Sequence, residues 1–361
     1  MYKCDNESYN LLFTILKDAL WGIAGTSRKI SEKECAELWK LAEKQAVSGM
    51  VFGTLTQKDI SLPEMRAFEA FAVTEQVKQH NRKIIESIKG IVEIFDEANV
   101  DYVIVKGQVV ASYYREPLLR HSGDVDYYCD SENFDKSLDV ASKALNVEIE
   151  DNGSSYHVHF DHKGVTYEGH FALVNLYDKG RQAYFQQLLD NDKGTRVDID
   201  GCQVKTLSPT LHVLYIFIHL YSHLTKLGVG LRQFCDMAVM LRNCHEQIEM
   251  DELRKNLENL GMERAYKACG TILVDQLGIT EKELGYALTD TDRKYGKRIL
   301  DVVMYRGNMG HYNKRTGFRG WKHKVEAMGI KLAHFAKFAP LTPKYSCGWL
   351  LNEMSKICYT H

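Results

Sequence analysis

The sequence predicts an α+β fold in which a small mixed β-sheet core is flanked by N-terminal and C-terminal helical regions. In residues 1–98 and 206–361, apolar residues recur three and four positions apart, which is the period of an amphipathic helix. Between them, residues 99–205 contain short runs of β-branched and aromatic residues bounded by turn-forming residues, as strands do. We therefore expect an N-terminal helical region, an α/β core and a C-terminal helical domain with these boundaries.

The composition is that of an ordinary globular protein. The chain has 361 residues, of which 45% are hydrophobic and 26% are charged, and its net charge is −2. This near-neutral balance gives no general attraction to nucleic acid or to anionic membranes. The nine cysteines are scattered without a Cys-x-x-Cys pair, which indicates reduced thiols and predicts a cytoplasmic location. The most hydrophobic run, residues 211–224, is too short to span a bilayer, so no transmembrane segment is expected.

Helix signals dominate the N-terminal region. Ser31 is expected as an N-cap, because glutamates follow it in the first turn. Pro63 is expected to open a long helix, whose far end carries an apolar stripe from Ile84 to Phe95. The region offers no chemical motif, so we expect it to pack against the core and to form one wall of a cleft.

The core is expected to be a mixed sheet of about five strands backed by two helices. Asn152-Gly153 and Lys163-Gly164 are turn signals between its later strands. Ser131 is expected to cap the second helix. The strands are expected at residues 102–105, 124–129, 146–150, 155–161 and 165–174, and the helices at 108–115 and 132–145.

The chain becomes helical again after the core. Residues 191–195 are polar and rich in turn formers, and we expect them to link the core to the C-terminal domain. Ser208-Pro209 is an N-cap and first-turn pair that opens the next helix. A glycine-containing break at residues 228–230 separates that helix from another at 231–243, and further helices follow.

An Asp-x-Asp pair in the second expected strand is the most informative chemical feature. Residues i and i+2 of a strand point to the same face, so Asp124 and Asp126 should lie side by side, with Val125 turned into the core. Two carboxylates about 7 Å apart repel each other unless a cation lies between them. Mg²⁺ prefers such oxygen ligands and shares them with substrate phosphates. A solvated turn is the alternative reading of the same residues.

A Lys-Gly turn precedes this pair. Lys106 and Gly107 follow a short apolar strand and lead into a helix. A strand, a glycine turn and a helix together present free backbone N–H groups to an anion. We therefore expect a phosphate-binding turn next to a metal-binding strand, both facing a cleft between the core and the helical domain.

Three motifs in this order carry a resemblance to a known family. They are Lys106-Gly107, the Tyr-x-x-Pro-x-x-Arg segment from Tyr114 to Arg120, and Asp124-Val125-Asp126. The chain resembles an uncharacterised bacterial nucleotidyltransferase family of the DNA polymerase β-like superfamily. The wider superfamily has Gly-Ser where this chain has Lys106-Gly107, and a shorter gap to the first aspartate. The resemblance implies that Mg²⁺ or Mn²⁺ assists transfer of a nucleoside monophosphate from a nucleoside triphosphate (NTP), such as ATP.

The resemblance also implies roles for particular residues. Glu168 and His170 match a Glu-x-His pair of the family, and alternation along the strand puts both on one face. Asp124, Asp126 and Glu168 would be the catalytic metal ligands, and Lys106, Gly107, Arg120 and Asp236 would contact the nucleotide. Arg115 is a further candidate for phosphate contact.

The charged residues expected to contact the nucleotide also have purely structural explanations. A salt bridge with Glu116 or a solvated loop would equally explain Arg115 and Arg120. Asp236 lies four residues after Arg232, so the two could form an ion pair on a helix surface.

Four histidines raise the question of a zinc site. His157 and His159 alternate on one expected strand, and His219 and His223 are four residues apart on an expected helix. The second pair has zinc-protease spacing, but Leu220 stands where a glutamate would follow His219. We expect His219 and His223 to line the cleft and the first pair to lie on a polar strand face.

A basic stretch at residues 311–344 contains interleaved aromatic residues, which suits RNA or an anionic membrane surface. A helix pair with solvent-facing charges is the alternative. The sequence leaves the acceptor open among a small molecule, a protein side chain and an RNA end. It also leaves open a catalytically inactive nucleotide-binding module and a metal-dependent phosphohydrolase.

Overall fold

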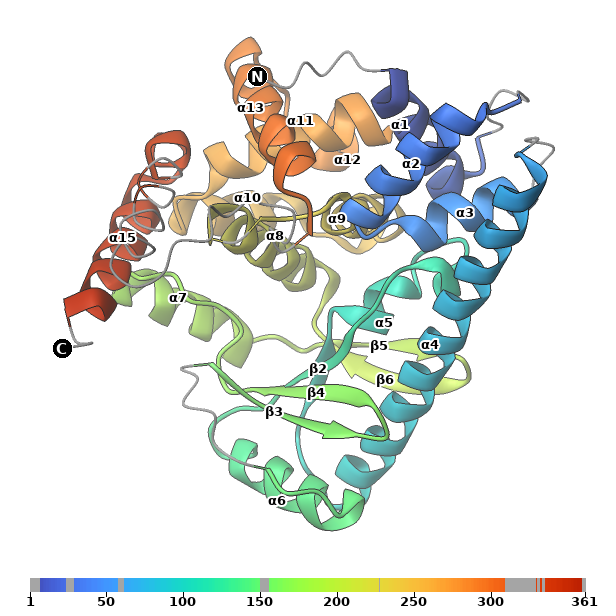
Figure 1. Ribbon diagram of the computed structural model, residues 1–361. Coiled ribbons are helices and arrows are strands. Elements are labelled where there is room, and N and C mark those ends of the chain that lie inside the picture. The colour runs from blue at the N-terminus through green and yellow to red at the C-terminus, as the bar shows by residue number, and fades with distance from the viewer. Residues whose placement is uncertain are drawn as a thin grey trace.

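The computed structural model describes residues 7–23, 29–57, 62–149, 156–226, 228–308, 329, 332 and 335–358. It confirms the α+β fold class, with helices packed on both faces of a small mixed sheet (Figure 1). In this described part, the α-helices are α1 Glu7–Trp21, α2 Glu32–Lys44, α3 Ser48–Gln57, α4 Glu64–Glu97, α5 Gly107–Ala111, α6 Phe134–Leu145, α7 Lys179–Asp190, α8 Pro209–Lys226, α9 Leu231–Asn243, α10 Met250–Asn259, α11 Glu263–Leu277, α12 Glu281–Leu284, α13 Asp290–Arg306 and α15 Pro343–Cys358, and the 3₁₀ helices are η1 Pro117–Leu119 and η2 His245–Gln247.

The central sheet has four strands among the described residues. Its order is β1-β2-β4-β3, where β2 and β4 are parallel and the other neighbours are antiparallel. A separate hairpin of β5 and β6 lies beside β1. The strands are β1 Val103–Val105, β2 Asp124–Tyr128, β3 His157–His162, β4 Val165–His170, β5 Thr195–Ile199 and β6 Cys202–Thr206.

The fifth strand expected at residues 146–150 is wrong over its described part. Helix α6 ends at Leu145, and its C-cap Asn146 adopts the left-handed conformation with φ 51°. Residues 147–149 form no strand. Asparagine tolerates this conformation, so the residue ends the helix rather than starting a strand. The expected Asn152-Gly153 turn lies outside the described residues. The Lys163-Gly164 turn between β3 and β4 is confirmed, with positive φ at both residues.

Two helix details also differ from expectation. The first core helix stops at Ala111 instead of Arg115, because turns and the 3₁₀ helix η1 occupy the segment before β2. The expected cap Ser131 is not used. Instead, Oδ1 of Asp130 accepts hydrogen bonds from the backbone N–H groups of Glu132 and Asn133.

The N-terminal expectations hold in detail. Ser31 forms a complete capping box with Glu34 at the start of α2. Pro63 directly precedes α4, whose apolar stripe packs on the sheet through residues such as Ile84 and Phe95. Helices α4 and α6 cover this face of the sheet (Figure 1). Val125 belongs to the same buried cluster as their apolar residues. The Asp-x-Asp side chains therefore emerge on the opposite face, toward α8 and α9.

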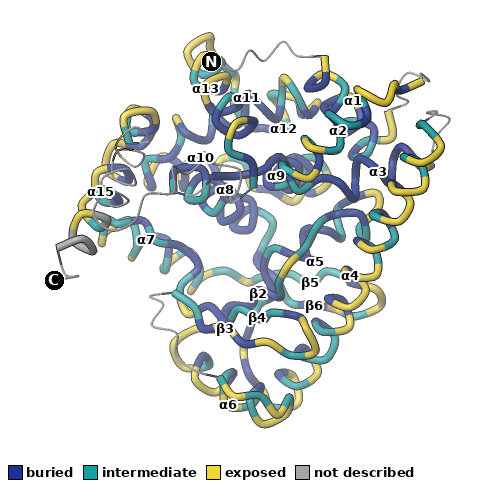
Figure 2. Tube along the Cα trace, in the orientation of Figure 1, coloured by how far each residue is buried: buried dark blue, intermediate teal, exposed yellow. Residues whose placement is uncertain are grey.

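The buried residues form two hydrophobic clusters, one between the sheet and helices α4 and α6 and a larger one on the other side of the sheet. Helices α8 and α9 lie at the centre of the larger cluster. Figure 2 shows both as largely buried, between the sheet and the outer helices. The beginning of α8 at Pro209 and the span of α9 match the sequence expectation. Among the described residues, no helix combines the length and apolar character needed to span a membrane.

Helix α7 and the β5–β6 hairpin were missed by sequence reasoning. Helix α7 begins after Asp178, whose side chain accepts a hydrogen bond from the backbone N–H of Arg181. The expected linker at residues 191–195 runs directly into β5, and a tight turn at Asp200-Gly201 joins β5 to β6. An Asp-Gly pair is a recognised hairpin signal, so this element was predictable.

Candidate active site

Strand register brings the acidic residues together. The parallel pairing of β2 with β4 places Asp126 opposite Glu168 and Asp124 opposite Thr166. Because strand side chains alternate, Asp124, Asp126, Glu168 and His170 share one face of the sheet. Ligand atoms of Asp126, Glu168 and His170 all lie within 4.8 Å of one another.

Lys106 forms an ion pair with Asp126. Residue Val105 pairs with Asp126 across β1 and β2, so Lys106 lies at the end of β1 beside the aspartate. Its Nζ is 2.7 Å from Asp126 Oδ1, and the two side chains are only 15% and 2% exposed. Lys106 has φ 57° and Gly107 has φ 43°, a backbone region that favours glycine and is uncommon for lysine. The turn therefore directs the lysine side chain onto the carboxylate.

His170 holds the same carboxylate from the other side. Its Nε2 is 2.8 Å from Asp126 Oδ1 and 3.6 Å from Glu168 Oε2. Burial lowers the pKa of His170, so the imidazole is neutral near neutral pH. Because the Asp126 carboxylate is an acceptor, the neutral ring donates its Nε2–H to it.

The three carboxylates perturb one another. Burial alone would raise the pKa of Asp126, but Lys106 and His170 hold it below its usual range. Burial and the neighbouring Asp126 charge raise the pKa of Glu168 to about 7. The charge of Asp126, together with burial, also raises the pKa of Asp124. A divalent cation would relieve this repulsion, and the carboxylate oxygens are suitable ligands for Mg²⁺ or Mn²⁺.

These carboxylates line a cavity of about 380 Å³ between the sheet and helices α8 and α9. The volume is within the range of small-molecule sites, about 300–1,000 Å³. The expected site residues meet here. Its lining includes Lys106, Gly107, Arg120, Asp124, Asp126, Glu168, His219, His223, Arg232 and Asp236.

Arg120 and Asp236 border this cavity but bind each other. Arg120 donates Nε–H to Asp236 Oδ1 at 2.7 Å and Nη2–H to Oδ2 at 2.8 Å. The Tyr114 hydroxyl also donates to Asp236 Oδ1, at 2.7 Å. The alternative pairings of Arg120 with Glu116 and of Asp236 with Arg232 are therefore wrong. This buried cluster fastens α9 to the segment that precedes β2.

Sequence reasoning missed Arg232 as a cavity residue. Its Nη1 donates to the backbone oxygen of His121 at 2.9 Å, and its Nε is buried without a hydrogen-bond partner among the described residues. Burial and the nearby Arg120 lower its pKa. Arg232 also lies in the first turn of α9, where the helix dipole disfavours a cation. The sequence signal was an arginine two residues after the Gly228–Gly230 break, in the first helical turn, where acidic residues are preferred.

The histidines of α8 lie where the sequence predicted. His219 and His223 line the cavity, and their Nε2 atoms are 3.1 Å apart. Burial lowers the pKa of His223 to about 4 and lowers that of His219 as well. Among the described residues, His157 and His159 belong to no group of three metal-ligating side chains. Most of the basic stretch at 311–344 lies outside the described residues.

Comparisons with known proteins give the family. A solved structure of an antigenic nucleotidyltransferase-like protein from Paracoccidioides brasiliensis is similar, with 17% identity and a TM-score of 0.32. That match covers 61% of this chain and 98% of the other. A search of curated proteins gave no match. A family model described as uncharacterised nucleotidyltransferase matches residues 31–277, which is more than half of the chain. The chain therefore belongs to this uncharacterised nucleotidyltransferase family.

Proposed function

We propose that the protein transfers a nucleoside monophosphate from an NTP to the hydroxyl group of an acceptor, with the help of Mg²⁺ or Mn²⁺. One observation carries the proposal. Asp124, Asp126 and Glu168 line one cavity together with Arg232, a guanidinium that has no carboxylate partner among the described residues. Such a cavity suits a cation and a polyphosphate at once. The Asp-x-Asp strand also supports a place in the DNA polymerase β-like nucleotidyltransferase superfamily.

The carboxylates would hold the metal ion. Asp124, Asp126 and Glu168 offer the oxygen ligands, and His170 fixes the orientation of Asp126 through its hydrogen bond. When bound, the ion would neutralise phosphate charge and lower the pKa of the acceptor hydroxyl. Neutral His170 keeps its proton on Nε2, so it acts here as a positioning residue.

The cations would hold the triphosphate. Arg232 presents a guanidinium, which can bind phosphate oxygens with two parallel hydrogen bonds. Lys106 borders the cavity and can contact both Asp126 and a phosphate, while Gly107 lets the backbone approach closely. We propose that Arg120 and Asp236 hold α9 against the segment before β2 and do not contact the nucleotide, because their charged atoms bind each other.

Glu168 is suited to accept a proton. Burial and the charge of Asp126 raise its pKa to about 7 in the metal-free site, and this added basicity suits a proton acceptor. The acceptor oxygen would attack the α-phosphorus while its proton passes to Glu168. The bond between the α-phosphorus and the bridging oxygen breaks, and pyrophosphate leaves.

Glu168→Gln is expected to separate binding from transfer. The change keeps the shape of the side chain but removes its charge and its basicity. Transfer should fall by a factor of about 10² or more, the range for a lost general base. Mg-NTP binding should stay nearly intact, because Asp124, Asp126 and the phosphates still supply ligands to the ion. Equilibrium NTP binding and single-turnover transfer measured on the same variant test this. Near-normal transfer would remove Glu168 from the mechanism.

Lys106→Met is expected to change nucleotide and metal affinity in opposite directions. Loss of a charged phosphate contact should weaken NTP binding by about 1–3 kcal/mol. Loss of the competing ammonium should tighten Mn²⁺ binding in the absence of nucleotide, because Asp126 then keeps only the neutral His170 as a partner. Calorimetric titration with each ligand tests both signs. Unchanged NTP affinity in a folded variant would give Lys106 a purely structural role.

The Lys106–Asp126 ion pair also favours a second candidate, a module that binds nucleotide without transferring it. In that case Lys106 already neutralises the carboxylate that catalysis needs. Incubation with each α-labelled NTP, Mg²⁺ or Mn²⁺ and a cell extract separates the candidates. Label on an acceptor, whether small molecule, protein or RNA, supports transfer. Label released as free monophosphate indicates phosphohydrolysis, and unchanged NTP indicates the binding module.

A further inference from the structure

Helix α8 presents two histidines to the metal and nucleotide cavity. Every residue of this helix from Thr210 to Ile218 is buried, whereas His219 and His223 are partly exposed and line the cavity. They are one helical turn apart, so their rings lie on the same face of the helix, and their Nε2 atoms are 3.1 Å apart. Neither imidazole has a role in the transfer steps given above.

The hydrogen bonds of the pair place the proton of His223 on its Nε2. The Nδ1 of His223 is buried and has no hydrogen-bond partner among the described residues, so a proton there would be an unsatisfied donor. On Nε2 the same proton is donated to His219 Nε2. Burial lowers the pKa values of both rings, so both are neutral near neutral pH. His223 is therefore the donor of the pair and His219 the acceptor.

This proton position disfavours a metal ion between the two rings. A metal bound to both Nε2 atoms would move the proton of His223 to the buried Nδ1, where it would have no hydrogen-bond partner in the described part of the chain. The surrounding charges also repel a cation. Besides burial, three cations lower the pKa of His223, namely Lys106, Lys226 and Arg232, and Asp126 opposes them. An anion is the ligand that suits this side of the cavity.

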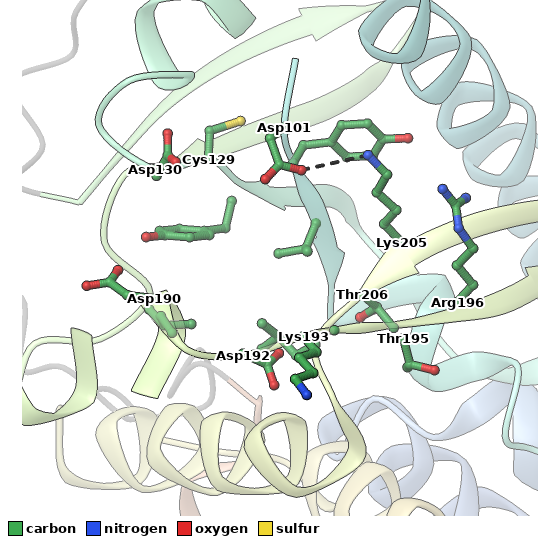
Figure 3. Close-up of a pocket in the computed structure, with 16 residues that line it drawn as sticks. Asp101, Cys129, Asp130, Asp190, Asp192, Lys193, Thr195, Arg196, Lys205 and Thr206 are labelled. Carbon is green, nitrogen blue, oxygen red and sulfur yellow. Dashed lines mark ion pairs between the residues drawn. The ribbon is translucent and has the colours of Figure 1, made fainter. Parts of the chain in front are cut away.

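A larger cavity, of about 480 Å³, lies at the other end of β1 and β2 and is less suited to an anion. Four aspartates and three basic residues border it, and Figure 3 shows the aspartates Asp101, Asp130, Asp190 and Asp192 around its open space. One of the basic residues, Lys205, has its Nζ 3.7 Å from Asp101 Oδ1. A polyphosphate would face an excess of carboxylates there, so the more favourable surroundings are those beside the α8 histidines.

We propose that His219 and His223 bind the two phosphates that leave the nucleotide as pyrophosphate. This role rests on the proposed nucleotidyl transfer, which places the α-phosphorus at the carboxylates of the sheet. A phosphate oxygen accepts the Nε2–H of His223. His219 no longer accepts that proton, and its own proton moves to Nε2, so both rings donate to the anion. Arg232 lines the same cavity and binds the same phosphates.

Inorganic pyrophosphate is the probe, and calorimetric titration of the full chain in the presence of EDTA is the measurement. Without a metal ion the carboxylates repel the anion, so binding depends on the histidines and the cations. The unchanged protein should bind one pyrophosphate. His223→Phe removes the donor and should weaken pyrophosphate binding about tenfold, the factor that corresponds to 1.4 kcal/mol. His223→Gln keeps an N–H donor and should recover part of the affinity.

His212→Phe is the matched control. His212 is buried on the same helix and does not line the cavity, so this variant should bind pyrophosphate as the unchanged protein does. Mn²⁺ binding without nucleotide should be the same in His223→Phe and in the unchanged protein, because the carboxylates hold the ion. Pyrophosphate affinity that is unchanged in folded His223→Phe, or Mn²⁺ affinity that falls as much as pyrophosphate affinity, would overturn the proposal.

Chemical modification tests the unchanged protein and needs no variant. Diethylpyrocarbonate reacts with accessible neutral imidazoles, and mass spectrometry identifies the modified residues. Pyrophosphate should slow the modification of His219 and His223 several-fold and leave that of His162 unchanged, because His162 does not line the cavity. Equal rates with and without pyrophosphate would contradict the proposal.

Neither measurement depends on nucleotidyl transfer. Pyrophosphate binding through the histidine pair in a protein that transfers nothing would reject the proposed function and leave the anion site in place. Normal transfer with pyrophosphate binding that does not depend on the pair would reject the anion site alone.

Discussion

Replacement of Asp126 by asparagine is expected to abolish nucleotidyl transfer. Asp126 contacts both Lys106 and His170, and its carboxylate lies opposite Glu168 across the parallel strands. It is the carboxylate with a lowered pKa, so it remains ionised and available to a metal ion. Loss of this ligand should reduce transfer by about 10³-fold, which corresponds to about 4 kcal/mol of transition-state stabilisation.

The matched control for this change is Asp161→Asn. Asp161 lies on β3, is exposed, and accepts a hydrogen bond from Thr166 Oγ1. It does not line the metal and nucleotide cavity. Single-turnover transfer measured on both variants, with circular dichroism to verify folding, decides the outcome. Equal transfer by the two variants would contradict the role given to Asp126.

Replacement of Asp236 by alanine is expected to cause the largest loss of stability. The Arg120 side chain is 3% exposed, so the change leaves a buried guanidinium without its carboxylate and removes the acceptor of Tyr114. Removing one partner of a buried ion pair lowers the free energy of unfolding by about 3–5 kcal/mol, because the remaining charge stays buried without compensation. Chemical denaturation of both proteins measures the difference in free energy of unfolding.

A double replacement separates structure from nucleotide binding. Arg120→Met with Asp236→Leu removes both charges, and should recover much of the lost stability because no buried charge is left unpaired. If these residues instead contact the nucleotide directly, Asp236→Ala would weaken NTP binding while the free energy of unfolding changed little. That result would contradict the positioning role.

The sequence could predict the acidic part of the site because it depends on local periodicity. Alternation places Asp124 and Asp126 on one strand face, and likewise Glu168 and His170. That Glu168 joins the two aspartates was implied only by the resemblance to a family, since alternation within each strand does not fix the register between strands. The positions of the cavity residues on α8 were predicted for a similar reason, because His219 and His223 are one helical turn apart.

The basic part of the site could not be predicted in the same way. Arg120 and Asp236 are 116 positions apart, so only the folded chain brings them together. Because Asp236 forms its ion pair with Arg120, Arg232 does not have the ion-pair partner that helical spacing suggested. The role of Arg232 thus depends on a distant contact. By contrast, the β5–β6 hairpin was missed although its Asp200-Gly201 turn was visible in the sequence.

The Asp-x-Asp carboxylates, as proposed above, hold a metal ion together with a nucleotide. The most direct measurement is a Mn²⁺ titration followed by electron paramagnetic resonance, with and without a non-hydrolysable NTP analogue. For the unchanged protein we expect Mn²⁺ binding that the analogue strengthens, because phosphates complete the ligand set. For the Asp124→Asn, Asp126→Asn double variant we expect that strengthened binding to be lost. Equal Mn²⁺ binding by the two folded proteins in the presence of the analogue would contradict the account.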